Sequence, residues 1–440
     1  MRLPSREWLT LQWQLIRPYA RYVYYKVFPR RRPPYFDAPW AYPGDRLDHA
    51  RDLPAPDPRV CIFLPMNDWH ARIQRSQQLA KAIADQDGQA VYANPHLGLE
   101  YRLPYYLDPH TRIAKLAPRL FELHIHLPRE HELGQRALTG PESSRVAREI
   151  GRLIDAGGIR KAALIVSFPA WLDAAEQLRR RYGFPIVYDC HDWLPGFERI
   201  APALLDLETA LFSRSDLVVF SSQRLQDRVL ERCRVGGETV LLRNAVEPVA
   251  AAPPLRPDDR RRVPIIGYVG ALDHWFHVEA VAAVALDHPA CRIVLAGRVE
   301  DQRVLELRQY PNVSFIGEVP YAEVAALLSG WDAAMIPFLV NDLTLATNPI
   351  KLYEYFRAGL PVVSTRLPEV ELCGELVYLA DTAQAFSAQA SEAIREQDPD
   401  LRAKRIETAR RETWPARAER LLVCIGLLGQ GNAPEFPPPR

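Results

Sequence analysis

The chain has 440 residues, of which 48% are hydrophobic and 25% charged, and this composition excludes a disordered, collagen-like or coiled-coil protein. Lys and Arg number 55 against 54 Asp and Glu, so the net charge of +1 excludes a uniformly basic nucleic-acid-binding protein. The length suffices for two or three domains.

Residues 1–57 form an N-terminal extension whose positive charge is concentrated in residues 1–32. That segment has eight basic side chains against one acid, Glu7, so the rest of the chain is mildly acidic. Trp, Tyr and aliphatic residues are interleaved with the basic ones in a helical stretch, which is typical of a helix in a membrane interface. We expect residues 1–32 to contact an anionic membrane surface. The alternative is a helix that docks on its own protein.

Residues 58–246 are predicted to form a first domain in which buried strands alternate with amphipathic helices. The expected strands are 59–64, 89–94, 121–125, 162–167, 185–190, 217–221 and 239–244. The expected helices are 75–86, 144–156, 173–182, 201–214 and 224–232. Strands rich in β-branched residues that alternate with helices indicate a parallel α/β sheet.

Residues 247–262 are rich in Pro and Ala and then charged, which predicts an interdomain linker. The alternation restarts in residues 263–398. The strands expected there are 264–270, 291–297, 313–317, 333–338, 361–365 and 376–380. Residues 399–440 hold a charged helix, roughly 399–424, and a Pro-rich tail. The predicted fold class is α/β, with two Rossmann-like domains facing each other across a cleft where ligands bind.

The six cysteines are scattered singly, which favours buried reduced thiols in a cytosolic protein over disulfides or a metal cluster. No apolar stretch approaches the roughly 20 residues that span a bilayer, and the N-terminus does not read as a signal peptide. We therefore expect a cytoplasmic protein that binds peripherally to the inner face of the membrane.

Residues 347–365, TNPIKLYEYFRAGLPVVST, carry the strongest chemical signal. Asn348 or Thr347 is expected to cap a helix whose first turn contains Lys351, beside the positive end of the helix dipole. A lysine there is unfavourable unless an anion lies nearby, and Glu354 follows one turn later. Amides and a lysine suit a diphosphate, and a carboxylate suits the hydroxyls of a ribose. The alternative is an ordinary helix with a surface Lys–Glu pair.

This stretch closely resembles the donor-site motif of GT-B glycosyltransferases, especially bacterial family-4 enzymes and the subgroup that contains the teichuronic acid glycosyltransferase. The matching residues are Pro349, Lys351, Glu354, Tyr355, Gly359, Pro361, Val362 and Val363, with Ala358 shifted to the place just before Gly359. The resemblance implies that Glu354 bonds the ribose and Lys351 the diphosphate of a nucleotide-diphosphate sugar. Asn348, at the start of the same motif, is a further candidate donor-binding residue. The resemblance also implies a hexosyltransferase that uses this sugar as co-substrate and needs neither a cofactor nor a metal.

The resemblance extends over about residues 58–420. It places Gly270 in a loop where the backbone approaches the donor phosphate, and Tyr321 at the border of the base. An Arg-rich turn in residues 67–80 would face the cleft. Arg298 is a candidate phosphate ligand, because the family's usual Arg and Lys after the Gly loop are missing here. The alternative for Arg298 is a solvated loop residue.

The chain departs from the family pattern at two further positions. Many retaining family-4 enzymes have a second Glu eight positions before the ribose Glu, and Ala346 stands there. Ala245 replaces the Gly of the usual Asn-Gly-Val hinge. The first change leaves the retaining or inverting outcome open. The C-terminal helix with Trp414 resembles the segment that crosses back to the first domain.

The sequence YDCHDW at residues 188–193 places Asp189, His191 and Asp192 at the end of a buried strand. Unpaired buried charge costs several kcal/mol, so a polar trio there needs a reason. The resemblance implies a catalytic or acceptor-binding role for this region. His191 or Asp192 would be the general base of an inverting reaction, or would orient the acceptor or sugar in a retaining one. The alternative is a His–Asp pair that caps the next helix.

His274 and Arg75 are further candidates on the acceptor side. His274 lies near Trp275 and His277 on the loop after Gly270, where it could touch the sugar or acceptor. Arg75 could bind an acceptor phosphate. Isolated loop histidines are often without a special role.

The leading hypothesis is a glycosyltransferase that moves a sugar to a lipid-linked or polysaccharide acceptor in bacterial cell-surface glycan biosynthesis. A nucleotide-sugar epimerase of the GlcNAc 2-epimerase type and a non-catalytic nucleotide-sugar-binding protein are the alternatives. A nicotinamide dehydrogenase is disfavoured, because neither domain opens with Gly-x-Gly-x-x-Gly.

Overall fold

The computed structural model describes residues 27, 44–57, 59–70, 72–94, 110–127, 134–198, 200–248 and 263–427. The predictions for residues 1–32, for most of the linker and for the C-terminal tail therefore lie outside the described residues. Among the described residues, no helix has the length and apolar character needed to cross a bilayer.

The first domain is built on a nine-stranded sheet with the order β1-β4-β5-β3-β2-β6-β7-β8-β9. Its strands are β1 Asp45–Arg46, β2 Val60–Leu64, β3 Gln89–Ala93, β4 Arg112–Ala117, β5 Leu120–His124, β6 Ala162–Val166, β7 Ile186–Cys190, β8 Leu217–Phe220 and β9 Glu238–Leu241. In the sheet order, all strands from β5 through β3 and β2 to β9 run parallel, as predicted for this domain. The prediction missed β1 and β4, which pair antiparallel at one edge.

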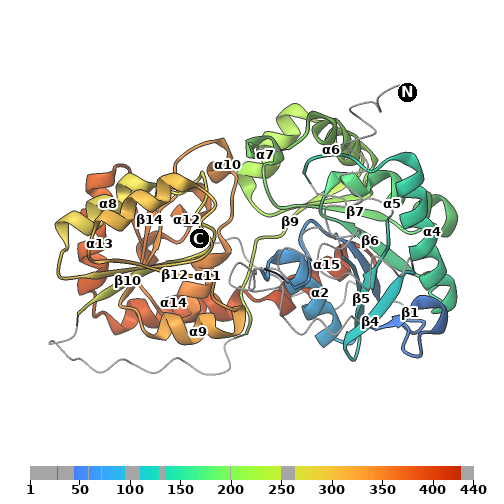
Figure 1. Cartoon of the computed structure of the whole chain (residues 1–440), viewed down its shortest axis with the longest axis horizontal. Helices are drawn as coiled ribbons and strands as arrows, with labels where there is room; N and C mark the ends of the chain where they lie inside the picture. The colour runs from blue at the N-terminus through green and yellow to red at the C-terminus, as the bar shows by residue number, and fades with distance from the viewer. Residues whose placement is uncertain are drawn as a thin grey trace.

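Helices cover both faces of this sheet (Figure 1). They are α2 Arg75–Asp85, α4 Gly140–Ala156, α5 Leu172–Tyr182, α6 Pro202–Arg214 and α7 Gln223–Arg232, with short 3-10 helices η3 Leu47–His49, η4 Pro169–Trp171 and η5 Leu194–Gly196. Apolar side chains of α4 to α7 form one core with the sheet, and those of α2 form a second core on its other face. Both faces are buried, so the central strands are apolar throughout rather than alternating.

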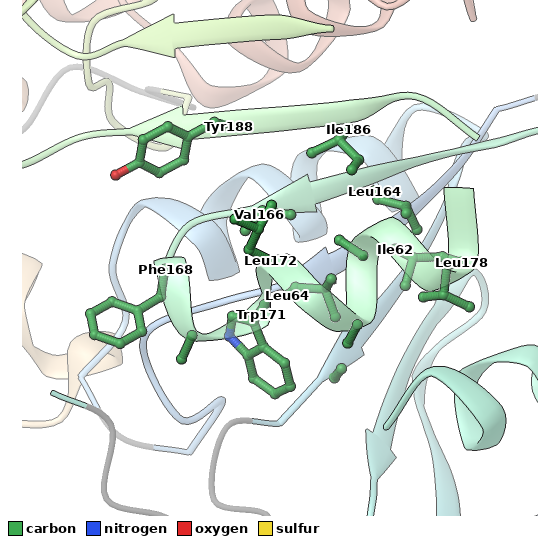
Figure 2. Close-up of a cluster of buried hydrophobic side chains, with 14 of the residues drawn as sticks. Ile62, Leu64, Leu164, Val166, Phe168, Trp171, Leu172, Leu178, Ile186 and Tyr188 are labelled. Carbon is green, nitrogen blue, oxygen red and sulfur yellow. The ribbon is translucent and has the colours of Figure 1, made fainter. Parts of the chain in front are cut away.

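Figure 2 shows the larger of these two cores, between the sheet and α5. Ile62, Leu164 and Ile186 lie on neighbouring strands and are fully buried, each contributing about 1.5–3 kcal/mol. Trp171 is also fully buried, and its indole Nε1 donates to the carbonyl oxygen of Pro65 at 2.8 Å. This bond ties the segment after β6 to the loop after β2.

The second domain contains a six-stranded parallel sheet with the order β12-β11-β10-β13-β14-β15. Its strands are β10 Ile265–Val269, β11 Arg292–Ala296, β12 Val313–Gly317, β13 Ala333–Ile336, β14 Val362–Thr365 and β15 Val377–Ala380. The helices are α8 Val278–Asp287, α9 Tyr321–Ser329, α10 Asp342–Leu345, α11 Ile350–Arg357, α12 Pro368–Glu371 and α13 Ala383–Arg395, with 3-10 helices η6 Gln302–Gln309 and η7 Gly374–Leu376. The predicted α/β class with two Rossmann-like domains is confirmed.

The predicted C-terminal helix is divided into α14 Pro399–Arg411 and α15 Trp414–Cys424. The prediction of one continuous helix was wrong, because Thr413 is extended and Pro415 lies in the first turn of α15. The α15 helix lies on the first domain beside α2 (Figure 1), and Trp414 is buried in the core there.

Candidate functional site

The strand order of the second sheet reverses between β10 and β13, and this switch point is where ligands of open α/β sheets bind. The loops that follow these two strands are joined by backbone hydrogen bonds. His277 N–H donates to the carbonyl oxygen of Pro337 at 2.8 Å, and Leu339 N–H donates to that of Trp275 at 2.7 Å. The predicted Gly loop and the segment that leads into α11 therefore meet at one edge.

Gly270 lies in close contact with the neighbouring loop at this edge. A Cβ atom added at Gly297 would lie 1.7 Å from the carbonyl oxygen of Gly270, so both loops depend on the absence of a side chain there. The Gly270 N–H donates to Ala296 at 2.9 Å. The two loops therefore have no side chains at the point where a ligand would approach the sheet, so the backbone itself is accessible there.

Lys351 and Glu354 lie on one face of α11, and Lys351 Nζ donates to Glu354 Oε2 at 2.8 Å. The Glu354 side chain is 6% exposed and that of Lys351 is 23% exposed. The structure thus brings together the predicted diphosphate and ribose ligands at the start of a helix that follows β13. Their roles in donor binding stay predictions.

Tyr321 is half-buried at the first position of α9. Burial raises the pKa of Tyr321, and the charge of Glu354 raises it further. Tyr321 is therefore within electrostatic range of Glu354, and its place at the border of the base stays a prediction.

Arg298 follows β11 on an exposed loop and lies 3.2 Å from Glu300. The same glutamate accepts from Arg72 of the first domain at 3.3 Å, and Arg72 also donates to Glu318 at 2.8 Å. Arg72 thus connects the loop after β2 with the second domain. The Arg-rich turn of the sequence pointed to this region, but Arg72 was not predicted individually.

Asn348 is buried at the contact between the two domains. Its Oδ1 accepts from the N–H of Asn244 at 2.8 Å, and its Nδ2 donates to Glu369 at 3.1 Å and to Tyr353 at 3.1 Å. This side chain therefore has protein partners on both its oxygen and its nitrogen, and its role in donor binding stays a prediction. Glu369, which was not predicted as a site residue, also accepts from Arg243 at 2.6 Å.

His191 and Asp192 lie just beyond the end of β7, with 3.7 Å between His191 Nε2 and Asp192 Oδ2. Nδ1 of His191 lies 3.0 Å from the carbonyl oxygen of Asp189 and can donate to it. When Nδ1 donates in this way, Nε2 is the ring nitrogen that is left to accept a proton. Burial raises the pKa of Asp192, although His191 and Arg75 act in the opposite direction. The predicted catalytic pair is thus brought together.

Asp189 and Arg75 form a buried ion pair, in which Arg75 Nε donates to both carboxylate oxygens at 2.9 and 3.1 Å. Arg75 Nη1 donates to Asn244 at 3.0 Å. The side chains of Arg75 and Asp189 are each 2% exposed. We predicted acceptor contacts for both residues, but the geometry favours an internal pair that positions the strand end and α2.

His274 lies between the domains among aromatic rings. Its ring is 4.8 Å from that of Trp275 and 6.5 Å from that of Phe197 of the first domain, measured between centroids. Nδ1 lies 3.3 Å from Asp273. Its role in acceptor binding remains a prediction.

Ala346 is fully buried and packs with the core of the first domain. Its carbonyl oxygen accepts from the hydroxyl of Ser222 at 2.6 Å. This position therefore belongs to the packed contact between the domains, which favours a small apolar residue.

The comparisons with solved structures identify the fold. Sucrose-phosphate synthase from Thermosynechococcus elongatus is 16% identical with a TM-score of 0.62, and the match covers 83% of this chain and 97% of that one. The Anabaena protein HepE, solved with UDP and glucose, is 15% identical with a TM-score of 0.57, covering 84% and 100%. The molecule has the GT-B fold, and the predicted resemblance to GT-B glycosyltransferases is confirmed.

Residues 263–396, nearly the whole second domain, match the family described as "Glycosyl transferases group 1". TuaH of Bacillus subtilis (strain 168), which is provisionally assigned as a teichuronic acid biosynthesis glycosyltransferase, is 27% identical over 203 residues. That match covers 42% of this chain and 51% of TuaH, so the chain spans about half the length of this relative.

Proposed function

We propose that this protein is a glycosyltransferase that moves a hexosyl group from a nucleotide-diphosphate sugar to an acceptor hydroxyl. The bond from the sugar C1 to the diphosphate breaks, a bond from C1 to the acceptor oxygen forms, and the nucleoside diphosphate leaves. The single observation that carries the proposal is the Lys351–Glu354 pair on α11, beside the switch point of a domain that matches group 1 glycosyltransferases.

The chemistry of the donor side follows from this pair. The first N–H groups of α11 and the Lys351 ammonium favour the negative diphosphate, while Glu354 accepts hydrogen bonds from ribose hydroxyls. Gly270 and Tyr321 border the same space, and Arg298 adds positive charge at its rim. The transfer would need no cofactor and no metal.

On the acceptor side, we assign the acceptor hydroxyl to the His191 and Asp192 pair. In an inverting transfer, His191 Nε2 would accept the proton of the attacking hydroxyl, and Asp192 would stabilise the imidazolium. In a retaining transfer, the same two residues would orient the acceptor. Ala346 leaves both outcomes open.

The acceptor class is proposed as a lipid-linked or polysaccharide glycan of the bacterial cell surface. TuaH, with its assignment to teichuronic acid biosynthesis, supports this class. The basic and aromatic composition of residues 1–32 supports an acceptor held at the anionic inner face of the membrane, where a peripheral enzyme would meet it.

A donor panel tests the proposal. UDP-, GDP- and dTDP-sugars are titrated calorimetrically into the wild type, Glu354→Gln and Glu323→Gln, the last being an exposed glutamate of the same domain. One nucleotide sugar is expected to bind the wild type and the Glu323 control equally and the Glu354 variant at least about tenfold more weakly, or about 1.4 kcal/mol. Absence of binding to the wild type would reject the donor site.

Turnover separates the transferase from its alternatives. With an acceptor, release of the nucleoside diphosphate is expected in step with glycosylation of the acceptor. An epimerase would convert the sugar donor without any acceptor, and a binding protein would leave it unchanged.

A further inference from the structure

A buried carboxylate lies between two imidazoles in the first domain, away from the donor helix. Glu122 and His124 are two residues apart on β5, so they share one face of the strand. Glu122 Oε1 lies 2.9 Å from His124 Nε2, and Oε2 lies 2.9 Å from His70 Nε2. His70 comes from the loop after β2, so the cluster joins segments that are far apart in the sequence.

Glu122 places a carboxylate in the interior of the first domain. Its side chain is fully buried, and a buried carboxylate is costly without positive charge nearby. The groups that approach its two oxygens are the imidazoles of His124 and His70, and imidazole is the commonest metal ligand in proteins.

We propose that His70, Glu122 and His124 bind a divalent transition-metal ion of the zinc type. Two histidines and one glutamate form a common donor set for zinc, with water in the fourth position. The ligand atoms of the three residues lie within 4.8 Å of one another, so small side-chain rotations bring them to coordination distance. Asn94 Nδ2 donates to Glu122 Oε1 at 2.7 Å and holds the carboxylate in place.

The ion has a structural consequence for the contact between the domains. The loop that carries His70 also carries Arg72, which donates to Glu318 of the second domain at 2.8 Å. A metal bound by His70 would fix this loop to the end of β5 and thereby position Arg72. Such an ion acts on domain geometry and takes no part in sugar transfer, so it is compatible with a metal-independent reaction.

The test measures metal binding directly and does not depend on the proposed activity. The full chain is freed of metal with a chelator and titrated calorimetrically with Zn²⁺, and bound metal is counted by elemental analysis. The variants are His70→Ala, His124→Ala and His49→Ala, the last removing an exposed histidine of the same domain as a control. Co²⁺ replaces Zn²⁺ in a parallel experiment, because its visible spectrum reports the coordination geometry.

One Zn²⁺ per chain is expected for the wild type and for His49→Ala, with at least about a tenfold loss of affinity in the other two variants. His124 is buried, so His124→Ala can fail to fold; His70, with a side chain 32% exposed, then decides the question alone. Absence of stoichiometric binding to the wild type, or equal binding by His70→Ala, would overturn the proposal and leave a purely hydrogen-bonded cluster.

Discussion

Asn244 and Asn348 join the two domains through a pair of hydrogen bonds. The N–H of Asn244 donates to Asn348 Oδ1 at 2.8 Å, and Asn244 Nδ2 donates to the carbonyl oxygen of Asn348 at 2.6 Å. Arg75 extends this contact to Asp189, at the end of the strand that precedes His191. A continuous buried chain of hydrogen bonds therefore connects the start of α11 with the proposed acceptor side.

Asn348→Ala removes one end of this contact. We expect a loss of about 2–4 kcal/mol in stability, because buried groups of Asn244 and Glu369 lose their partner. Urea unfolding measures the loss, and hydrogen exchange should become faster at the Asn244 amide. Gln302→Ala, on an exposed helix position, is the control. An unchanged exchange rate at Asn244 would contradict the assignment.

Arg75→Met leaves the Asp189 carboxylate buried without its partner. Breaking such a pair typically costs about 3–5 kcal/mol, whereas replacing both partners by apolar residues restores part of the loss. We therefore expect the double variant with Asp189→Leu to be more stable in urea than Arg75→Met alone. Lys404→Met, which removes an exposed ion pair with Glu375, should change stability little. Additive losses in the double variant would argue against the pair.

Ala346→Glu introduces the glutamate that the resembled family-4 pattern has at the corresponding position. We expect destabilisation by several kcal/mol and no gain in turnover, because the position is fully buried in the domain contact. Thermal unfolding and nucleotide release measure the two effects. Ala322→Glu, at an exposed position of α9, is the matched control. A stable variant with faster turnover would show that the position faces the reacting sugar.

Glu208 makes stability depend on pH in a defined direction. Burial raises the pKa of Glu208 from 4.5 to about 7, although the hydrogen bond from Tyr188 acts in the opposite direction. Between pH 4.5 and 7 the folded state then binds more protons than the unfolded state, so stability falls as pH rises. The free energy of unfolding, measured by urea titration from pH 5 to about 8, should therefore fall more steeply in the wild type than in Glu208→Gln, by at most about 1.4 kcal/mol per pH unit. Parallel curves would contradict the raised pKa.

Deletion of residues 1–32 tests the membrane proposal. The full chain should sediment with vesicles that contain anionic lipid, less so at high salt, and the shortened chain should stay in the supernatant. Vesicles of neutral lipid are the control. Equal sedimentation of both proteins would place membrane contact elsewhere or exclude it.

Much of the fold could be predicted, because parallel strands buried on both faces are recognisable as short apolar runs. The antiparallel edge strands β1 and β4 were missed: β1 spans two residues, and β4 is partly exposed. The division between α14 and α15 was missed because residues on both sides of Glu412 favour a helix.

The sequence by itself determined the domain order, the α11 motif with Lys351 and Glu354, and the polar strand end near His191, since each depends on residues close together in the chain. Tertiary structure alone decided which of these polar groups are already occupied. Asn348, Arg75 and Asp189 are held by distant partners, while His70, Glu122 and His124 converge on one point. Such pairings depend on how strand ends from separate segments meet, which local spacing does not encode.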